Sequence, residues 1–177
     1  NPPHLMPTVE VIRGAQTADA ALDLTCELAR RIGRVPIRVE KDAPGFLWNR
    51  LQLALIREAL HVVEQGIASP EAVDQAVTAG LGLRWAAVGP LRLMDLGGLA
   101  TFHSVAAYLY QDLSKASEPQ HALATKVAAG ETGARAGRGF YDYPAGSAEA
   151  AIAARDARLF ELLKLLRLPA FRERDTA

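Results

Sequence analysis

The chain has 177 residues, of which 50% are hydrophobic and 23% charged, and its 20 basic residues balance its 20 acidic ones. This length is sufficient for one soluble domain with a core of its own, and the single cysteine, Cys26, excludes an internal disulfide or a multi-cysteine zinc site. The balanced charge argues against a dedicated nucleic-acid binder, because such proteins need basic surfaces to neutralise phosphates. No apolar run reaches the roughly 20 residues needed to span a bilayer. We therefore expect a cytoplasmic protein without nucleic-acid or membrane partners.

The first residues, Asn1-Pro2-Pro3-His4, carry neither an initiator methionine nor the basic and apolar regions of a signal peptide. We expect the chain to be a fragment of a longer protein. A processed N-terminus is the alternative.

Residues 1–40 predict two short strands and one helix. The β-branched run 8–12 is typical of a strand. Thr17 is a good N-cap for a helix whose apolar residues recur at helical spacing until Gly33. A second strand is predicted over 36–39. The segment 42–45 then excludes regular structure, because proline holds its predecessor extended and glycine adopts backbone angles that other residues avoid.

Residues 41–177 predict a helical domain. One long helix is expected from Phe46 to Gln65, and Ser69-Pro70 starts another that ends near Gly80. A loop follows over 82–90, from which Pro90 can open a further helix. Additional helices are expected near 121–129 and from Ser147. The pattern predicts a mainly α chain of about seven helices with two short strands at its N-terminal side.

Several kinds of chemistry are not indicated. A Rossmann domain is marked by a strand, Gly-x-Gly-x-x-Gly and a helix, and neither Gly80-Leu81-Gly82 nor Gly137-Arg138-Gly139 completes that pattern. The four histidines lack the short spacings of metal ligands, so no metal site is expected. Cys26 lies on an apolar helix stripe, which favours a buried core thiol. Two groups of arginines, at 30, 31, 34 and 38 and at 155, 158 and 167, are most simply solvated helix faces or ends, and an anion-binding role for either group is the alternative.

Three features are not explained by core packing. Glu10 interrupts an apolar strand, Asn49 follows a Pro-Gly turn in the first turn of a long helix, and Gly89-Pro90 ends a loop. Each has a simple structural interpretation as well. Glu10 can face solvent on an edge strand, Asn49 can help to cap the helix, and Gly89-Pro90 can mark an ordinary helix start.

These features belong to a series of segments that follow one another along the chain: 1–3, 9–12, 42–50, 89–90 with Asp95 and Gly98-Leu99, and 137–143. Together and in this order, the segments resemble the C-terminal half of the L-3-hydroxyacyl-CoA dehydrogenases over nearly the whole chain. The Pro-Gly-Phe-x-x-Asn-Arg element is the most specific of them.

The resemblance implies a C-terminal domain of the 6-phosphogluconate dehydrogenase type and a homodimer formed through that domain. It implies that residues 1–40 end the junction between domains, and that the NAD-binding Rossmann domain is absent from this chain. By the same resemblance Glu10 orients a general-base histidine, which is expected just upstream of Asn1, and Asn49 hydrogen-bonds the substrate. Asn1 and Arg135 match positions close to NAD, which the missing domain is expected to bind.

The substrate signals conflict. The tail Gly139-Phe140-Tyr141-Asp142-Tyr143 resembles the acyl-CoA branch of the family, and this resemblance implies oxidation of a 3-hydroxyacyl-CoA to the 3-ketoacyl-CoA, which is the favoured interpretation. The loop 82–90 is more similar to the L-carnitine and L-gulonate dehydrogenases and to lambda-crystallin, which favours a small polar hydroxy acid. A third alternative is a non-enzymatic helical dimerisation module in which Glu10 and Asn49 are inert.

Overall fold

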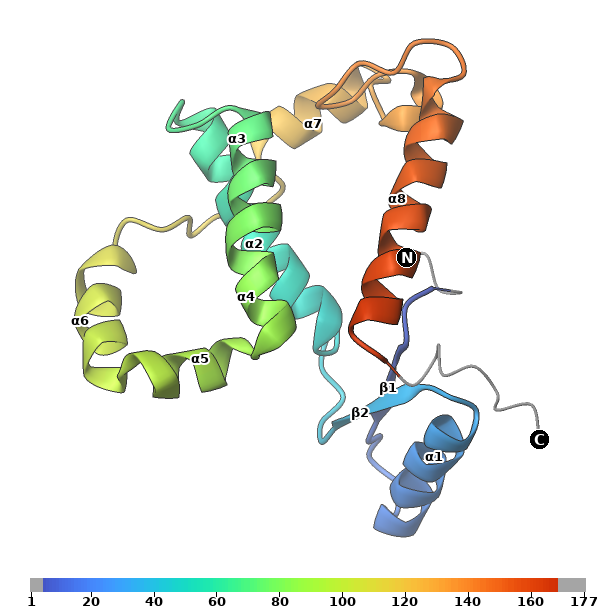
Figure 1. Ribbon diagram of the computed structural model, residues 1–177. Coiled ribbons are helices and arrows are strands. Elements are labelled where there is room, and N and C mark those ends of the chain that lie inside the picture. The colour runs from blue at the N-terminus through green and yellow to red at the C-terminus, as the bar shows by residue number, and fades with distance from the viewer. Residues whose placement is uncertain (1–4, 169–177) are drawn as a thin grey trace. The chain divides into compact units, whose positions relative to one another are not determined.

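A computed structural model describes residues 5–168 and shows a chain built mostly of helices (Figure 1). The described residues form two compact units. One contains the residues up to Gln52 and those from Asp142, and the other is Leu53–Tyr141. None of the helices within residues 5–168 is long and apolar enough to cross a membrane.

The first unit begins with a β-α-β arrangement. Strands β1 (Thr8–Ile12) and β2 (Val35–Val39) pair in parallel, with Thr8 opposite Val35 and Ile12 opposite Val39. Parallel neighbours need a crossover connection, and helix α1 (Asp19–Arg31) supplies it. Val11 of β1 packs against Leu22 and Cys26 of α1 to form the buried cluster of the β-α-β arrangement. Cys26 is a buried free thiol, as its place on the apolar stripe predicted.

Two local predictions for this unit need correction. Thr17 does not cap α1, because the N-cap is Ala18 and the Thr17 hydroxyl accepts a hydrogen bond from the Gly14 backbone N–H. Arg34 is not a solvated helix end. It is half-buried and donates a hydrogen bond from Nη1 to the carbonyl oxygen of Met6 at 2.9 Å.

Helix α2 (Trp48–Glu64) begins in the first unit and continues into the second. Helix α8 (Ser147–Leu165) completes the described part of the first unit and begins where the sequence predicted it. The remaining elements of the second unit are α3 (Pro70–Gln75), η1 (Ala76–Leu81), α4 (Gly82–Ala87), α5 (Pro90–Gly97), α6 (Leu99–Leu109), α7 (His121–Ala128) and η2 (Ala134–Ala136).

The segment predicted as a loop over 82–90 is largely helical. Helix α3 does not stop at Gly80 but continues through the π-helical turn η1 into α4. Gly82 has ordinary right-handed helical angles, and a Cβ at this position would lie 2.9 Å from the carbonyl oxygen of Val77. This glycine therefore permits the close approach of the π turn instead of ending the helix.

Carboxylates of α2 hold the segment that leads into α7. Glu58 accepts a hydrogen bond from the Ser114 backbone N–H at 2.8 Å, and Glu64 accepts one from the Ala122 N–H at 2.7 Å. Because the first N–H groups of a helix lack partners within it, Glu64 satisfies one such group of α7. These contacts lie within the second unit.

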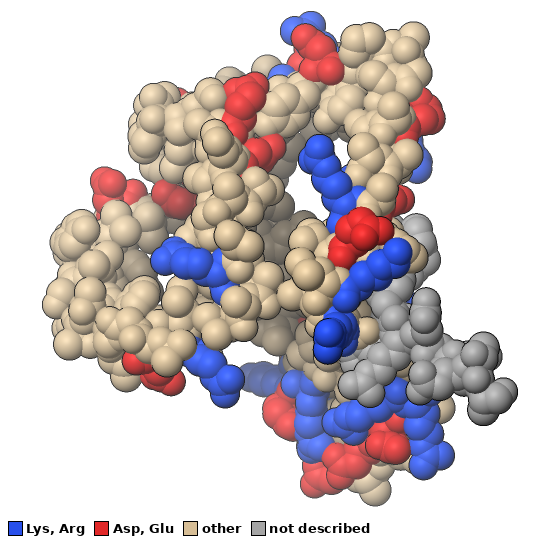
Figure 2. All heavy atoms as spheres, in the orientation of Figure 1, with Lys and Arg blue, Asp and Glu red and all other residues tan. Residues whose placement is uncertain are grey.

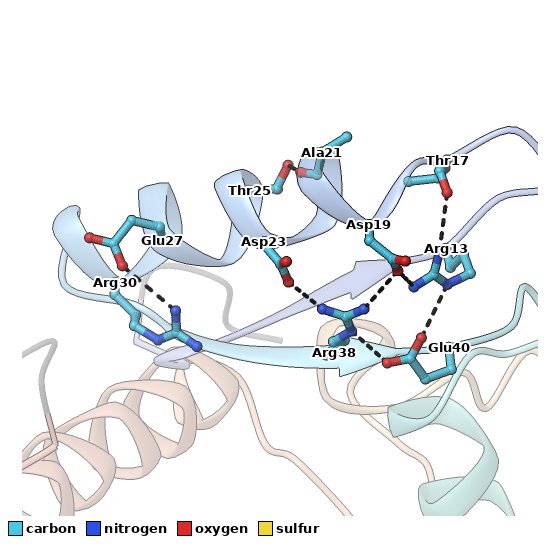
Figure 3. Close-up of polar contacts among 10 residues, drawn as sticks. All are labelled: Arg13, Thr17, Asp19, Ala21, Asp23, Thr25, Glu27, Arg30, Arg38 and Glu40. Atoms are coloured by element: carbon cyan, nitrogen blue, oxygen red, sulfur yellow. Dashed lines mark hydrogen bonds and ion pairs between the residues drawn. The ribbon is translucent and has the colours of Figure 1, made fainter.

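An exposed network of charges joins α1 to the carboxyl ends of both strands (Figure 3). Arg13, which follows β1, pairs with Asp19 and, at 3.1 Å, with Glu40. Arg38 of β2 pairs with Asp19, Asp23 and Glu40. The hydrogen bond from Arg13 lowers the pKa of the Asp19 carboxyl, and that from Arg38 lowers the pKa of Glu40.

This network predicts how stability depends on pH. A carboxylate whose pKa is lowered by folding stabilises the folded state above its ordinary pKa, and that contribution is lost as the pH falls through the lowered value. Asp19 and Glu40 have ordinary pKa values of 3.8 and 4.5. We therefore expect the double variant Asp19→Asn, Glu40→Gln to be less stable than the parent at neutral pH.

The difference should shrink as the pH falls below about 4 and should also shrink in 1 M salt, which screens exposed charges. Urea unfolding of both proteins over this pH range is the measurement. A difference that stays constant with pH would show that the two carboxylates stabilise the unit in some other way.

Candidate active site

Glu10 lies on the face of β1 opposite to α1. Side chains alternate along a strand, and the neighbouring Val11 packs on α1, so Glu10 points away from that helix. Its Oε1 atom accepts hydrogen bonds from the backbone N–H groups of Leu47 at 2.8 Å and Trp48 at 2.9 Å. Trp48 begins α2, so Glu10 caps that helix, where the helix dipole favours an anion. Glu10 is thus half-buried and held on one side of the strand.

A tight turn before α2 makes these two hydrogen bonds possible. Gly45 and Phe46 are both in the left-handed region, with φ of 79° and 48°. The Phe46 N–H donates to the carbonyl oxygen of Ala43 at 2.9 Å, and the Arg50 guanidinium donates to that of Pro44 at 3.3 Å. Glycine adopts this conformation freely, but phenylalanine rarely does. The Phe46 backbone is therefore strained beside the candidate site, where such strain is commonly found.

The left-handed angle of Phe46 predicts different effects for two substitutions that both remove its ring. Asparagine tolerates left-handed backbone angles, whereas β-branched valine does not. We expect Phe46→Val to lower the free energy of unfolding by about 1–3 kcal/mol more than Phe46→Asn does. Urea titration of the two variants is the measurement. Equal losses would mean that the ring, and not the backbone angle, decides the contribution of this residue.

Glu10 and Asn49 line one cavity of about 400 Å³ in the first unit, together with Met6, Thr8, Val9, Arg34 and Trp48. The structure thus brings together the two residues that the sequence proposed as catalytic. Within residues 5–168 the second carboxylate oxygen of Glu10 makes no hydrogen bond, so it is available to orient a base or a substrate group. The Asn49 amide can donate to an oxygen atom in the same cavity.

The other predicted site residues are not gathered in this way. Asn1 lies outside the described residues. Arg135 lies in η2, in the glycine-rich turn of the second unit, where Gly133 and Arg138 form an isolated antiparallel bridge. The roles of Asn1 and Arg135 near a cofactor therefore stay predictions. No group of three or more metal-binding side chains is found within residues 5–168.

Sequence reasoning missed Arg34 and Trp48 as members of this cavity. Arg34 directly precedes β2, and the parallel register places Val35 opposite Thr8, so Arg34 lies beside the start of β1. This position could not be deduced without the strand pairing. Trp48 could have been noticed, because it lies inside the Pro-Gly-Phe-x-x-Asn element directly before Asn49.

Two family models match consecutive parts of the chain. The model of the 3-hydroxyacyl-CoA dehydrogenase C-terminal domain matches residues 45–143, and that of the NAD binding domain matches residues 1–43. The chain belongs to the 3-hydroxyacyl-CoA dehydrogenase family.

The relatives of this chain are named for different substrates. The chain is 37% identical over 166 residues to 5-formyl-3-hydroxy-2-methylpyridine 4-carboxylate 5-dehydrogenase of Mesorhizobium japonicum, and the match covers 94% of this chain and 54% of that protein. A crystal structure of such a 5-dehydrogenase, described as an NAD+ dependent dismutase, matches with a TM-score of 0.90 and 37% identity, over 94% of this chain and 54% of that one.

Two further relatives represent the substrate classes that the sequence left open. L-carnitine dehydrogenase of Streptomyces griseus is 47% identical over 98 residues, which cover 55% of this chain and 29% of that protein. A probable 3-hydroxybutyryl-CoA dehydrogenase of Deinococcus radiodurans is 38% identical over 144 residues, 81% of this chain and 50% of that protein. The chain thus spans about half the length, or less, of these curated relatives.

The prediction that the NAD-binding Rossmann domain is absent from this family member is wrong, because the NAD binding domain model matches residues 1–43. These residues include the parallel β1–α1–β2 unit, which is the building block of dinucleotide-binding domains. The glycine fingerprint marks only one strand-to-helix turn of such a domain. A segment without that turn can still belong to the domain, so the missing fingerprint did not justify the conclusion. Nor is NAD shown to be bound by a missing domain.

Proposed function

We propose that the protein is an NAD-dependent dehydrogenase that oxidises a hydroxyl-bearing carbon of a small carboxylate substrate. The observation that supports this proposal is the shared cavity of Glu10 and Asn49, in which the Glu10 carboxylate is held by two backbone N–H groups. The parallel β1–α1–β2 unit is of the kind that dinucleotide-binding domains contain, and the NAD binding domain model matches residues 1–43, which supports NAD as the cofactor. We propose Asn1 and Arg135 as residues near that cofactor.

NAD, when bound, accepts the hydride that leaves the substrate carbon. The hydroxyl proton must leave at the same time, and a histidine with a near-neutral pKa suits that transfer. We propose such a histidine just before Asn1 in the full-length gene product. Glu10 would orient this base through Oε2 and stabilise its cationic form, as carboxylates do in catalytic triads. Asn49 would donate its amide N–H to the substrate oxygen.

A small carboxylate is favoured over an acyl-CoA by the names of two relatives. The relative that matches 94% of the chain is named for a pyridine carboxylate, and its formyl group acquires a hydroxyl on the reacting carbon when it is hydrated. L-carnitine, the substrate named for another relative, is also a small hydroxy acid.

Oxidation of a 3-hydroxyacyl-CoA to the 3-ketoacyl-CoA, as in β-oxidation, is the second candidate. It is supported by the relative named 3-hydroxybutyryl-CoA dehydrogenase and by the segment Gly139–Tyr143. The deciding experiment measures NADH formation by the full-length gene product with three substrates: 5-formyl-3-hydroxy-2-methylpyridine 4-carboxylate, L-carnitine and (S)-3-hydroxybutyryl-CoA.

We expect one of the two small carboxylates to give the highest kcat/KM. A preference for the CoA thioester would support the second candidate instead. Failure to reduce NAD with any of the three would contradict both candidates and favour a non-enzymatic helical module.

We also propose a homodimer formed through the helices of the second unit. Apolar side chains are exposed on α5 and α6, including Leu91 at 77%, Leu96 at 72% and Tyr108 at 67%. Figure 2 shows few charged side chains over these two helices, whereas acidic and basic residues are interspersed around α1. An isologous dimer would remove such a surface from water.

Sedimentation equilibrium is expected to show a dimer at roughly tens of micromolar, because burial of an apolar surface drives such association. The double variant Leu91→Glu, Leu96→Glu should shift the protein to monomer. Leu24→Glu, at an exposed position on α1, is the matched control and should leave the dimer intact. A monomeric parent protein, or equal effects of both variants, would contradict the proposed dimer interface.

We also propose a cytoplasmic location, which the single cysteine supports, because such a chain fits a reducing compartment.

A further inference from the structure

We propose that the Glu10–Asn49 cavity binds a planar aromatic carboxylate, with Arg34 pairing with the carboxylate and Trp48 stacking on the ring. The proposal rests on the dehydrogenase function above and narrows its substrate class. It follows from the side chains that line the cavity: one cation, one large aromatic, two flexible or branched apolar groups and three polar groups.

Arg34 is held in place while part of its guanidinium stays available. Nη1 donates to the carbonyl oxygen of Met6, another residue that lines the cavity, at 2.9 Å. This is the only hydrogen bond of the Arg34 side chain within residues 5–168, and no acidic residue of that range pairs with it. Nε and Nη2 therefore remain for a ligand. A guanidinium edge matches the two oxygens of a carboxylate, and anchoring lowers the entropy lost on binding.

Trp48 supplies the only aromatic side chain among the described residues that line the cavity. Trp48 as a whole residue is 39% exposed, although its backbone N–H is used by Glu10. The indole therefore has a surface left for a ligand. Aromatic rings prefer stacked or edge-to-face contacts with other rings, and the Met6 thioether adds a favourable contact with an aromatic edge. A flat ring uses these surfaces better than a saturated chain does.

The charge of the cavity argues against a quaternary ammonium ligand, the other kind of group that tryptophan recognises. Such a ligand would share the cavity with the Arg34 cation. The one carboxylate among the lining residues, Glu10, has Oε1 occupied by two N–H donors, and its Oε2 is the atom proposed above to orient the general base. An aromatic carboxylate can pair with the Arg34 guanidinium, for which no other acidic partner is present within residues 5–168. Its ring substituents would then lie near Glu10 and Asn49, where oxidation is proposed.

The test uses the full-length gene product. Four probes are titrated by isothermal calorimetry: pyridine-4-carboxylate, cyclohexanecarboxylate, pyridine-4-methanol and L-carnitine. The first two differ in the ring, and the first and third differ in the charge. Trp85→Leu, at a tryptophan that does not line the cavity, is the matched control for Trp48→Leu.

We expect pyridine-4-carboxylate to bind about 3- to 10-fold more tightly than cyclohexanecarboxylate, in line with the usual gain from ring stacking. Arg34→Gln should weaken its binding about 10- to 100-fold while leaving pyridine-4-methanol unchanged, because only a charged ligand uses the guanidinium. Trp48→Leu, which keeps the N–H that Glu10 binds, should remove the preference for the aromatic ring.

Equal binding of the aromatic and saturated acids, tighter binding of L-carnitine, no effect of Arg34→Gln, or no binding of any probe would each overturn the proposal. These outcomes are separable from the dehydrogenase function. If the full-length gene product reduces NAD with an aliphatic hydroxy acid but does not bind pyridine-4-carboxylate, the dehydrogenase function stands and this substrate class is lost. Tight binding of the aromatic acid without any NAD reduction would support this ligand class and contradict the dehydrogenase function.

Discussion

Replacing Glu10 with glutamine should lower the kcat of the full-length gene product by about 10²- to 10⁴-fold, with a much smaller change in KM. Glutamine keeps an Oε1 acceptor for the N–H groups of Leu47 and Trp48, so the cap on α2 is retained. What is lost is the negative charge. That charge matters most when the neighbouring base becomes cationic in the transition state, which is why kcat and not KM should change.

The chain offers a matched control for this substitution. Glu58 also accepts a backbone hydrogen bond, from Ser114 at 2.8 Å, but it lies in the second unit and outside the cavity. Glu58→Gln should leave kcat nearly unchanged. Glu10→Ala should lose both the charge and the helix cap, and therefore stability as well as turnover. If Glu10→Gln keeps more than about half of the parent turnover with an intact fold, Glu10 is only a structural cap and is not part of the catalytic machinery.

Replacing Leu22 with alanine should lower the free energy of unfolding by about 2–5 kcal/mol, the usual cost of removing a buried leucine side chain. Leu22 is 1% exposed and packs against Val11 and Cys26. This core lies directly beneath β1, on the face opposite to Glu10. The loss should therefore also loosen the strand that holds the candidate catalytic carboxylate.

Leu24→Ala is the control, since Leu24 lies on the same helix and is 70% exposed. It should change the free energy of unfolding by no more than about 0.5 kcal/mol, as is typical of surface positions. Chemical denaturation of both variants provides the measurement. A loss below about 1 kcal/mol for Leu22→Ala would show that the small β-α-β core contributes little to stability.

Local patterns were sufficient for most helices and for both strands. The β-branched run at 8–12 forms β1, Ser69 caps α3 by accepting a hydrogen bond from the Ala72 N–H, and Pro90 opens α5. Each of these depends on side-chain chemistry within one turn or one short run. The error at 82–90 has a physical cause. Helices commonly end at a glycine, which is why a loop was predicted here. At Gly82, however, the missing side chain lets a π turn close against the backbone of Val77, and the helix continues.

The sequence by itself determined the candidates for the site: a carboxylate inside an apolar strand, and an asparagine after a Pro-Gly turn. It could not determine that Glu10 binds the N–H groups of residues 37 and 38 positions away, or that Arg34 shares the cavity. Those contacts depend on the parallel pairing of β1 with β2 and on the left-handed angles of Gly45 and Phe46. Strand pairing and the turn before α2 bring together residues that are far apart in the sequence. The spacing of side chains along a strand shows which face is polar, but it does not show which distant backbone groups contact that face.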